Sequence, residues 1–189
     1  MNFIGLLQIV VAMSTGAQDA SAAQVEPESL TPFRIQFVRS VTGMNVEVLL
    51  DGKYRKTSSA GRLYIRSETN SAGSYCGDIR SPMRSGQYFS VIQRSSKAVG
   101  GNIAKAGNIV AAGFHKARTQ AECAALQLAI WEAVEDGGKT PDFSNGHFAV
   151  RAPSDVLALA GEFYKAVSTP AEAIYLQTGG DGQSQFTAF

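Results

Sequence analysis

The sequence predicts an α+β protein built on an antiparallel β-sandwich or barrel framework, with a helical subdomain in its second half. In the first half, apolar and polar residues alternate with a period of two, which is typical of half-buried strands. In the second half, apolar residues recur at helical spacing between capping and stop signals. The 189 residues, 44% of them hydrophobic and 17% charged, exclude a disordered chain and suffice for one buried core.

The first half contains short predicted strands that are separated by turn residues. The alternation predicts strands over residues 33–38, 45–50, 63–65, 74–79 and 88–92. Turns are predicted at Thr42–Gly43 and at Asp51–Gly52, and the second of these is typical of a hairpin. Pro82 and Gly86 separate the last two strands, because both residues interrupt regular strand pairing.

The second half begins with a moderate helical pattern at 102–114 and a strong one from Thr119 to Asp136. Thr119 and Glu122 form a T-x-x-E capping box, and Gly137–Gly138 supplies the stop. A short strand at 146–150 precedes a helix that Ser154 is expected to cap and that ends before Pro170. Segments 173–176 and 184–188 flank a glycine-rich turn and predict a closing hairpin.

The N-terminal segment has the pattern of a secretory signal peptide. An apolar run, Phe3–Met13, precedes Ala20-Ser21-Ala22, which matches an A-x-A cleavage site. This predicts a signal peptide over 1–22 and one domain over 23–189, β-rich at 33–94, helical at 102–136, and closing with a helix and hairpin at 146–189. The run is shorter than the roughly 20 residues of a membrane span, and a net charge of +1 gives no footprint for nucleic acid. We therefore expect a secreted protein, extracellular or periplasmic.

One glutamine lies on the unexpected side of the helix predicted from Thr119 to Asp136. Acidic residues, Glu132 among them, gather on one side of this helix. Gln127 shares the opposite, apolar side with Cys123 and Trp131, each about one turn away. A buried primary amide without partners costs about 1–3 kcal/mol. The amide is therefore expected either to bond nearby backbone or to have a chemical role.

The second unusual feature is the strand that carries Cys76. In an extended strand, Cys76 shares a face with Ser74 and Asp78, while Tyr75 and Ile79 point the other way. The polar neighbours indicate that the thiol faces a cleft or a strand edge.

Two segments resemble the signature motifs of bacterial thioester domains. Tyr75–Ile79 (YCGDI) is similar to the "YC-x-D" strand of that family, and Ala124–Glu132 (AALQLAIWE) is similar to its "Q-x-AIW" helix. The family's general layout is also matched by Ala60–Leu63, Gly146–Val150 and Leu176–Gln177, so the resemblance covers most of residues 23–189. Two positions depart from it: Leu126 stands where many members have threonine, and Cys123 is an additional cysteine.

The resemblance implies an internal thioester that joins the Cys76 side chain to the Gln127 side chain. Such a bond captures an amine or hydroxyl of a host or cell-surface protein or glycan, as in an adhesive or cross-linking module. Each molecule reacts once, so the protein is not expected to be an enzyme with turnover, and neither a cofactor nor a metal is implied. The candidates for lining the site are Tyr75, Asp78, Trp131 and His147.

Two alternatives remain open at this stage. A Cys76–Cys123 disulfide would make the protein a disulfide-stabilised structural or binding domain, since thiols oxidise outside the cell. The loop-closure model gives such a bond about 4 kcal/mol of stabilisation. A cysteine hydrolase would pair Cys76 with His115 or His147, which only folding could bring together.

Overall fold

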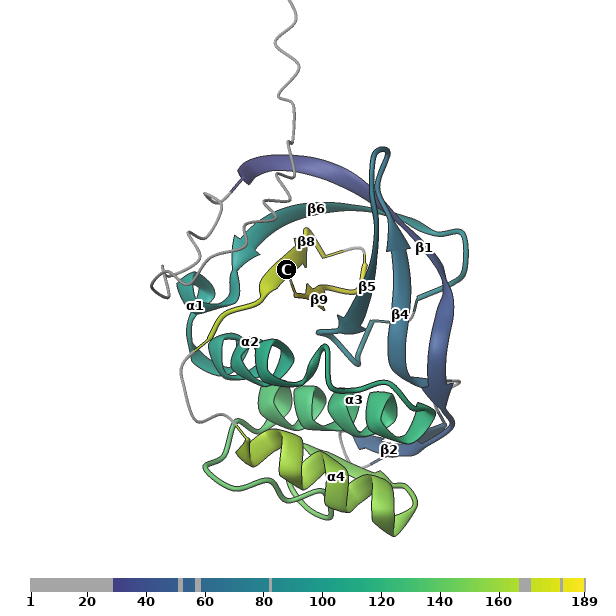
Figure 1. Ribbon diagram of the computed structural model, residues 1–189, viewed down its shortest axis with the longest axis vertical. Helices are drawn as coiled ribbons and strands as arrows, with labels where there is room; N and C mark the ends of the chain where they lie inside the picture. Colours follow the sequence, from purple (N-terminus) through teal and green to yellow (C-terminus); the bar gives the residue numbers. More distant parts are fainter. Residues whose placement is uncertain are drawn as a thin grey trace, which may run out of the picture.

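The computed structural model describes residues 29–50, 53–56, 59–81, 83–166, 171–180 and 182–188, and these form an α+β fold (Figure 1). The helices are α1 (Ser96–Val99), α2 (Gly101–Gly113), α3 (Gln120–Glu135) and α4 (Ser154–Lys165). The strands are β1 (Ser29–Met44), β2 (Glu47–Leu50), β3 (Lys53–Lys56), β4 (Ala60–Arg66), β5 (Ser71–Cys76), β6 (Tyr88–Ser95), β7 (Phe148–Arg151), β8 (Ile174–Thr178) and β9 (Gln185–Thr187).

Six antiparallel strands close into a barrel in the order β1–β4–β5–β9–β8–β6. Strand β1 pairs with both β4 and β6, and register shifts along it bend the strand around the barrel. Gly61 permits the close approach of β4 to β1, because its φ is +157° and a Cβ there would overlap the Thr42 carbonyl oxygen. The predicted fold class, an α+β protein with an antiparallel barrel framework, is confirmed.

A smaller antiparallel sheet of order β3–β2–β7 stands beside the barrel. Helices α2, α3 and α4 lie together below the barrel in Figure 1, with α3 packed between the other two. Helix α3 also contacts β1, β4 and β5, so it joins the helical layer to the end of the barrel. No helix in the described ranges is long and apolar enough to cross a membrane.

Two hydrophobic clusters meet at α3 and β5. The first fills the barrel and extends to the small sheet, and it takes in Cys76 of β5 together with Leu128 and Trp131 of α3. The second lies between the barrel wall and α2, and it takes in Tyr75 of β5 with Cys123 of α3. Adjacent residues of β5 therefore face different clusters, as the alternation of side chains along a strand requires.

Most predicted elements are present, and the capping box of α3 is confirmed. The Thr119 side chain accepts the Glu122 N–H, and the Glu122 carboxylate accepts the Thr119 N–H. Gly137, with φ of +62°, follows the helix and ends it, as its sequence position predicted. These features depend on residues close together in the chain, which explains why the sequence predicts them well.

Three local predictions are wrong. Thr42–Gly43 is not a turn, because β1 continues through it in register with β4. The strand that carries the first cysteine ends at Cys76 and not at Ile79. Ser154 does not cap α4, since Pro153 occupies the N-cap without a side-chain bond. Helix α3 is buried all round from residue 123 to 133, so that the acidic Glu132 is only 2% exposed, a burial that the sequence did not predict.

Strand β3 and helix α1 appear in the structure without having been predicted. Several predictions fall outside the described residues. These are the signal peptide over 1–22, the turn at Asp51–Gly52, and the positions Pro82 and Pro170.

Candidate functional site

The two motif residues, 51 positions apart in the chain, meet in the buried interior. The Cys76 backbone N–H donates to Gln127 Oε1 at 2.9 Å, and Gln127 Nε2 donates to the Cys76 carbonyl oxygen at 2.9 Å. Gln127 is fully buried and Cys76 is 3% exposed. The primary amide thus has partners for both of its polar ends, and the Gln127 amide group lies against the residue that carries the thiol.

This contact exists because β5 loses one of its neighbours just before Cys76. The pairing of β5 with β4 ends at Ser74, which lies opposite Leu63, whereas pairing with β9 continues to Cys76. Gly77 donates to Ser184 on the β9 side, so the N–H and C=O of Cys76 point to the opposite side. There the Gln127 amide takes the place of a strand and satisfies both groups, which would otherwise be buried without partners.

The Cys76 thiol is held in a neutral state. Burial raises its pKa from 9.0 to about 12, opposed in part by the Trp131 indole N–H and by a hydrogen bond with the Asp78 backbone. The thiol lies 3.1 Å from the Asp78 carbonyl oxygen, to which it donates. Within the described part of the chain, the Trp131 indole nitrogen has no acceptor of ordinary hydrogen-bond geometry. Its N–H is therefore available to the sulfur.

Cys123 lies on the other side of β5 from Cys76. Both cysteines are free and buried. The Cys123 thiol points to the Ala117 carbonyl oxygen at 3.5 Å and neighbours the Tyr75 hydroxyl. Because Cys123 lies about one turn before Gln127 on α3, a position of Cys76 beside Gln127 was expected to bring the two thiols close together. Instead the two thiols belong to different clusters, an arrangement that favours Gln127 over Cys123 as the partner of Cys76.

The other predicted lining residues fall into two groups. Trp131 and Asp78 contact the Cys76 sulfur, the first through its side chain and the second through its backbone. Tyr75 adjoins Cys76 but faces the second cluster, with its ring against Phe114. The side chain of His147 is exposed, and its backbone N–H binds Asp136 at the far end of α3. No contact found among the described residues joins it to Cys76 or Gln127.

Sequence analysis missed a buried polar chain that leads away from the thiol. Ser74 donates to Gln185 Oε1 at 3.1 Å, and Gln185 Nε2 donates to Gln183 Oε1 at 3.2 Å. Gln183 Nε2 in turn donates to the carbonyl oxygens of Asp78 at 2.6 Å and Ser81 at 2.7 Å. The signal in the sequence was two glutamines spaced two apart beside a short strand, which places both on one face.

The arrangement suits acyl chemistry better than thiolate catalysis. A cysteine hydrolase with turnover rests with its nucleophile as a thiolate of lowered pKa, whereas the pKa of Cys76 is raised. His115 and His147 are both exposed, so neither histidine lies in the interior with the buried thiol. Among the residues described, no group of three or more His, Cys, Asp or Glu side chains is placed to hold a metal ion.

Comparison of the chain with protein-family models, with curated proteins and with solved structures finds no match. The assignment of a function therefore depends on the residues and on their geometry. The feature with the clearest chemical meaning is the buried contact between the Gln127 amide and Cys76.

Proposed function

We propose that this protein is a thioester domain that joins Cys76 Sγ to Gln127 Cδ and later transfers the Gln127 acyl group to a nucleophile on a surface. The observation that carries the proposal is the pair of 2.9 Å hydrogen bonds between the Gln127 amide and the backbone of Cys76. These bonds hold an acyl carbon against the residue that bears the thiol, in a site that excludes water.

The bond-forming step needs no external reagent. The Cys76 sulfur adds to Gln127 Cδ, the thiol proton passes to Nε2, and ammonia leaves as the C–N bond breaks. Negative charge develops on Oε1 during this step, and the Cys76 N–H already donates to that oxygen. The raised pKa of the thiol favours a neutral thioester over a buried thiolate, because a neutral product places no charge in the interior.

The attachment step reverses the first with a different nucleophile. An amine or hydroxyl adds to Cδ, the S–C bond breaks, and the proton of the nucleophile returns to the Cys76 sulfur. The Trp131 indole N–H supports the departing sulfur, since it is buried and has no other acceptor in the described structure. The protein ends covalently attached to its target and reacts once. The proposal includes a secreted location, which rests on the pattern of residues 1–22.

The same contact supports a second candidate function, a structural role. With both ends satisfied, the Gln127 amide acts as a clamp that fastens α3 to the open edge of β5 without any covalent bond. The protein would then be an extracellular structural or binding domain with two free thiols.

Intact mass of the purified protein separates the candidates. A thioester gives a mass lower by one ammonia, retained in mild reductant, and incubation with methylamine adds one methylamine at Gln127. A disulfide gives a loss of two hydrogens that reductant reverses. The full unmodified mass with two titratable thiols would overturn the thioester and leave the clamp.

The chain offers a matched pair of variants for this measurement. Cys76→Ala removes the mass change in both cross-linked forms. Cys123→Ala, which deletes a similarly buried thiol from the helix that carries Gln127, preserves the loss of ammonia and abolishes only a disulfide. Loss of the ammonia signal in Cys123→Ala would contradict the assignment to Cys76 and Gln127.

A further inference from the structure

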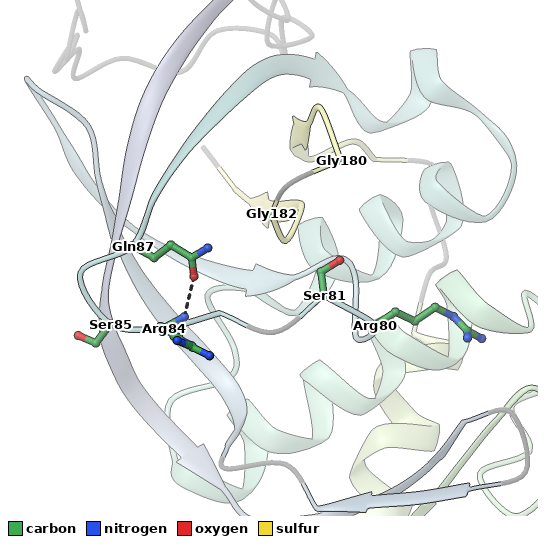
Figure 2. Close-up of a pocket in the computed structure, with 7 residues that line it drawn as sticks. All are labelled: Arg80, Ser81, Arg84, Ser85, Gln87, Gly180 and Gly182. Carbon is green, nitrogen blue, oxygen red and sulfur yellow. Dashed lines mark hydrogen bonds between the residues drawn. The ribbon is translucent and has the colours of Figure 1, made fainter.

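A cleft of about 700 Å³ opens on the outer side of the segment that covers the Cys76 thiol. Its lining comes from the loop between β5 and β6 and from the turn between β8 and β9 (Figure 2). The lining residues are Arg80, Ser81, Arg84, Ser85, Gln87, Gly180 and Gly182. No step of the proposed thioester formation uses this cleft.

Hydrogen bonds of one side-chain amide link the cleft wall to the carbonyl oxygen that accepts the thiol. Ser81 lines the cleft, and its carbonyl oxygen accepts from Gln183 Nε2 at 2.7 Å. The same nitrogen donates to the Asp78 carbonyl oxygen at 2.6 Å, and that oxygen also accepts the Cys76 thiol at 3.1 Å. Gln183 is 8% exposed and follows Gly182, another lining residue. The Gln183 amide is thus shared between a residue that lines the cleft and the backbone beside the reacting sulfur.

The charged side chains on the cleft are arginines. Arg80 forms a 2.9 Å ion pair with Glu135 of α3, which holds it at one rim. Arg84 is exposed, and its backbone N–H is fixed by Gln87 Oε1 at 3.0 Å (Figure 2). The Asp78 carboxylate is engaged inside the loop by the Arg80 N–H and the Ser81 hydroxyl. The exposed guanidinium of Arg84 therefore favours a carboxylate as its ligand, because a guanidinium can bind a carboxylate through two parallel hydrogen bonds.

The same surroundings favour an amine as the nucleophile. A hydroxyl must lose its proton to a base before it attacks well, and the two carboxylates described near the thiol are already engaged: Asp78 accepts two hydrogen bonds and Glu135 pairs with Arg80. An amine is nucleophilic in its neutral form. Nearby guanidinium groups lower the pKa of an ammonium and so raise the neutral fraction.

We propose that this cleft binds the acceptor of the thioester, and that the acceptor is a lysine within an acidic peptide segment. A carboxylate of the segment binds Arg84, and the lysine amine displaces the Gln183 amide and attacks Gln127 Cδ. An amide bond forms, the S–C bond breaks, and the amine proton passes to the Cys76 sulfur. This inference rests on the proposed thioester function and names its acceptor.

The test measures rates of covalent addition to the full-length protein by intact mass. Two peptides are compared, acetyl-Glu-Lys-Glu-amide and acetyl-Gln-Lys-Gln-amide, with methylamine as the small reference amine. We expect the acidic peptide to add about tenfold faster than the neutral one, and the advantage to shrink in high salt. Arg84→Gln should remove most of this ratio. Arg151→Gln, the same change on exposed β7 of the other sheet, should preserve it.

A second variant tests the route. Gln183→Ala removes the amide that is hydrogen-bonded to Ser81 and to the Asp78 carbonyl oxygen, so it should accelerate addition of both peptides.

The outcomes separate the two proposals. Absence of ammonia loss and of any methylamine adduct overturns the thioester and this inference together. A thioester that captures methylamine but adds both peptides at equal rates overturns the inference alone, as does an undiminished ratio in Arg84→Gln. Faster addition of a neutral oligosaccharide than of the acidic peptide overturns it as well, in favour of a glycan acceptor.

Discussion

The two faces of β5 offer a comparison between two buried thiols. Cys76, on the inner face, is 3% exposed, and Cys123, beside the outer face, is 1% exposed. The backbone of Cys76, the residue that carries the inner thiol, forms two hydrogen bonds with the Gln127 amide. Among the described residues, the outer thiol meets the Ala117 carbonyl oxygen and the Tyr75 phenol. Burial of the two thiols is therefore nearly equal, and the difference between them is that the residue of the inner thiol is hydrogen-bonded to a side-chain amide.

The faces also differ in how their polar groups are satisfied. The inner face carries a connected chain of hydrogen bonds through Ser74, Gln185 and Gln183. The outer face is aromatic, with Tyr75 against Phe114 at a ring-centroid distance of 5.8 Å. A connected polar network specifies one geometry, because each group lost leaves a partner buried and unpaired. The hydrogen bonds of the inner face thus fix the positions of its side chains, whereas the outer face is stabilised by aromatic packing.

Removal of the Gln127 amide is expected to have the largest effect. Gln127→Ala leaves a cavity and deprives the Cys76 N–H and C=O of their partners, so the free energy of unfolding should fall by about 3–5 kcal/mol. Denaturant unfolding measures this change. Gln120→Ala, an exposed glutamine on the same helix, serves as the control and should cost less than about 1 kcal/mol. Equal costs would mean that the inner face has no special network.

Protonation of Glu132 should have the next largest effect on stability. This residue lies toward the far end of α3, and its titration distinguishes that region from the two thiols. Burial, together with Asp136 and Asp142, raises the pKa of Glu132 from 4.5 to about 7, opposed by the Asp142 N–H and by Lys105. The folded protein keeps this proton up to about pH 7, whereas the unfolded chain loses it near 4.5. Stability from this group is complete below pH 4.5 and is lost as pH rises through 7. Allowing for solvent screening, we expect a decrease of about 2 kcal/mol.

Unfolding measured between pH 4 and 8 checks the Glu132 prediction. Glu132→Gln should flatten the profile, because an amide does not titrate. Cys76 should not contribute over this range, since its pKa lies near 12. A profile that keeps its slope in Glu132→Gln would assign the pH dependence to another group.

Trp131→Phe tests whether the indole N–H acts as a hydrogen-bond donor to the Cys76 sulfur. Phenylalanine keeps the edge-on contact of this position with Phe148 but removes the indole N–H. We expect methylamine to add to the thioester about tenfold more slowly, because the leaving sulfur loses a hydrogen-bond donor. An unchanged rate would show that the indole serves only for packing.

Tyr75→Phe should have the smallest effect and tests the outer face. In the described structure the Tyr75 hydroxyl is buried and has no partner of ordinary hydrogen-bond geometry. Its removal should change the free energy of unfolding by less than about 1 kcal/mol, and ammonia loss should persist. A cost comparable to that of Gln127→Ala would show a second network on the outer face and end the contrast between the two.

The elements that the sequence predicted well depend on neighbours in the chain. The two residues of the capping box, Thr119 and Glu122, lie three positions apart, and strand alternation needs only five or six residues. The placement of Gln127 on a buried side of α3 also followed from helical spacing. The same spacing did not indicate that Glu132 is buried as well, because α3 is covered on all sides by elements from distant parts of the chain.

The sequence by itself determined the fold class, the limits of α3 and the two residue types that a thioester requires. Only the tertiary structure decided that Cys76 faces Gln127 while Cys123 faces Tyr75. It also decided that Gln183 is hydrogen-bonded both to Ser81, which lines a cleft, and to the carbonyl oxygen that accepts the Cys76 thiol. The physical reason is that these contacts join residues far apart in the chain. They form where the pairing of β5 with β4 ends and Gln127 of α3 binds the free edge of β5. No pattern of neighbouring residues in the sequence indicates where that pairing ends.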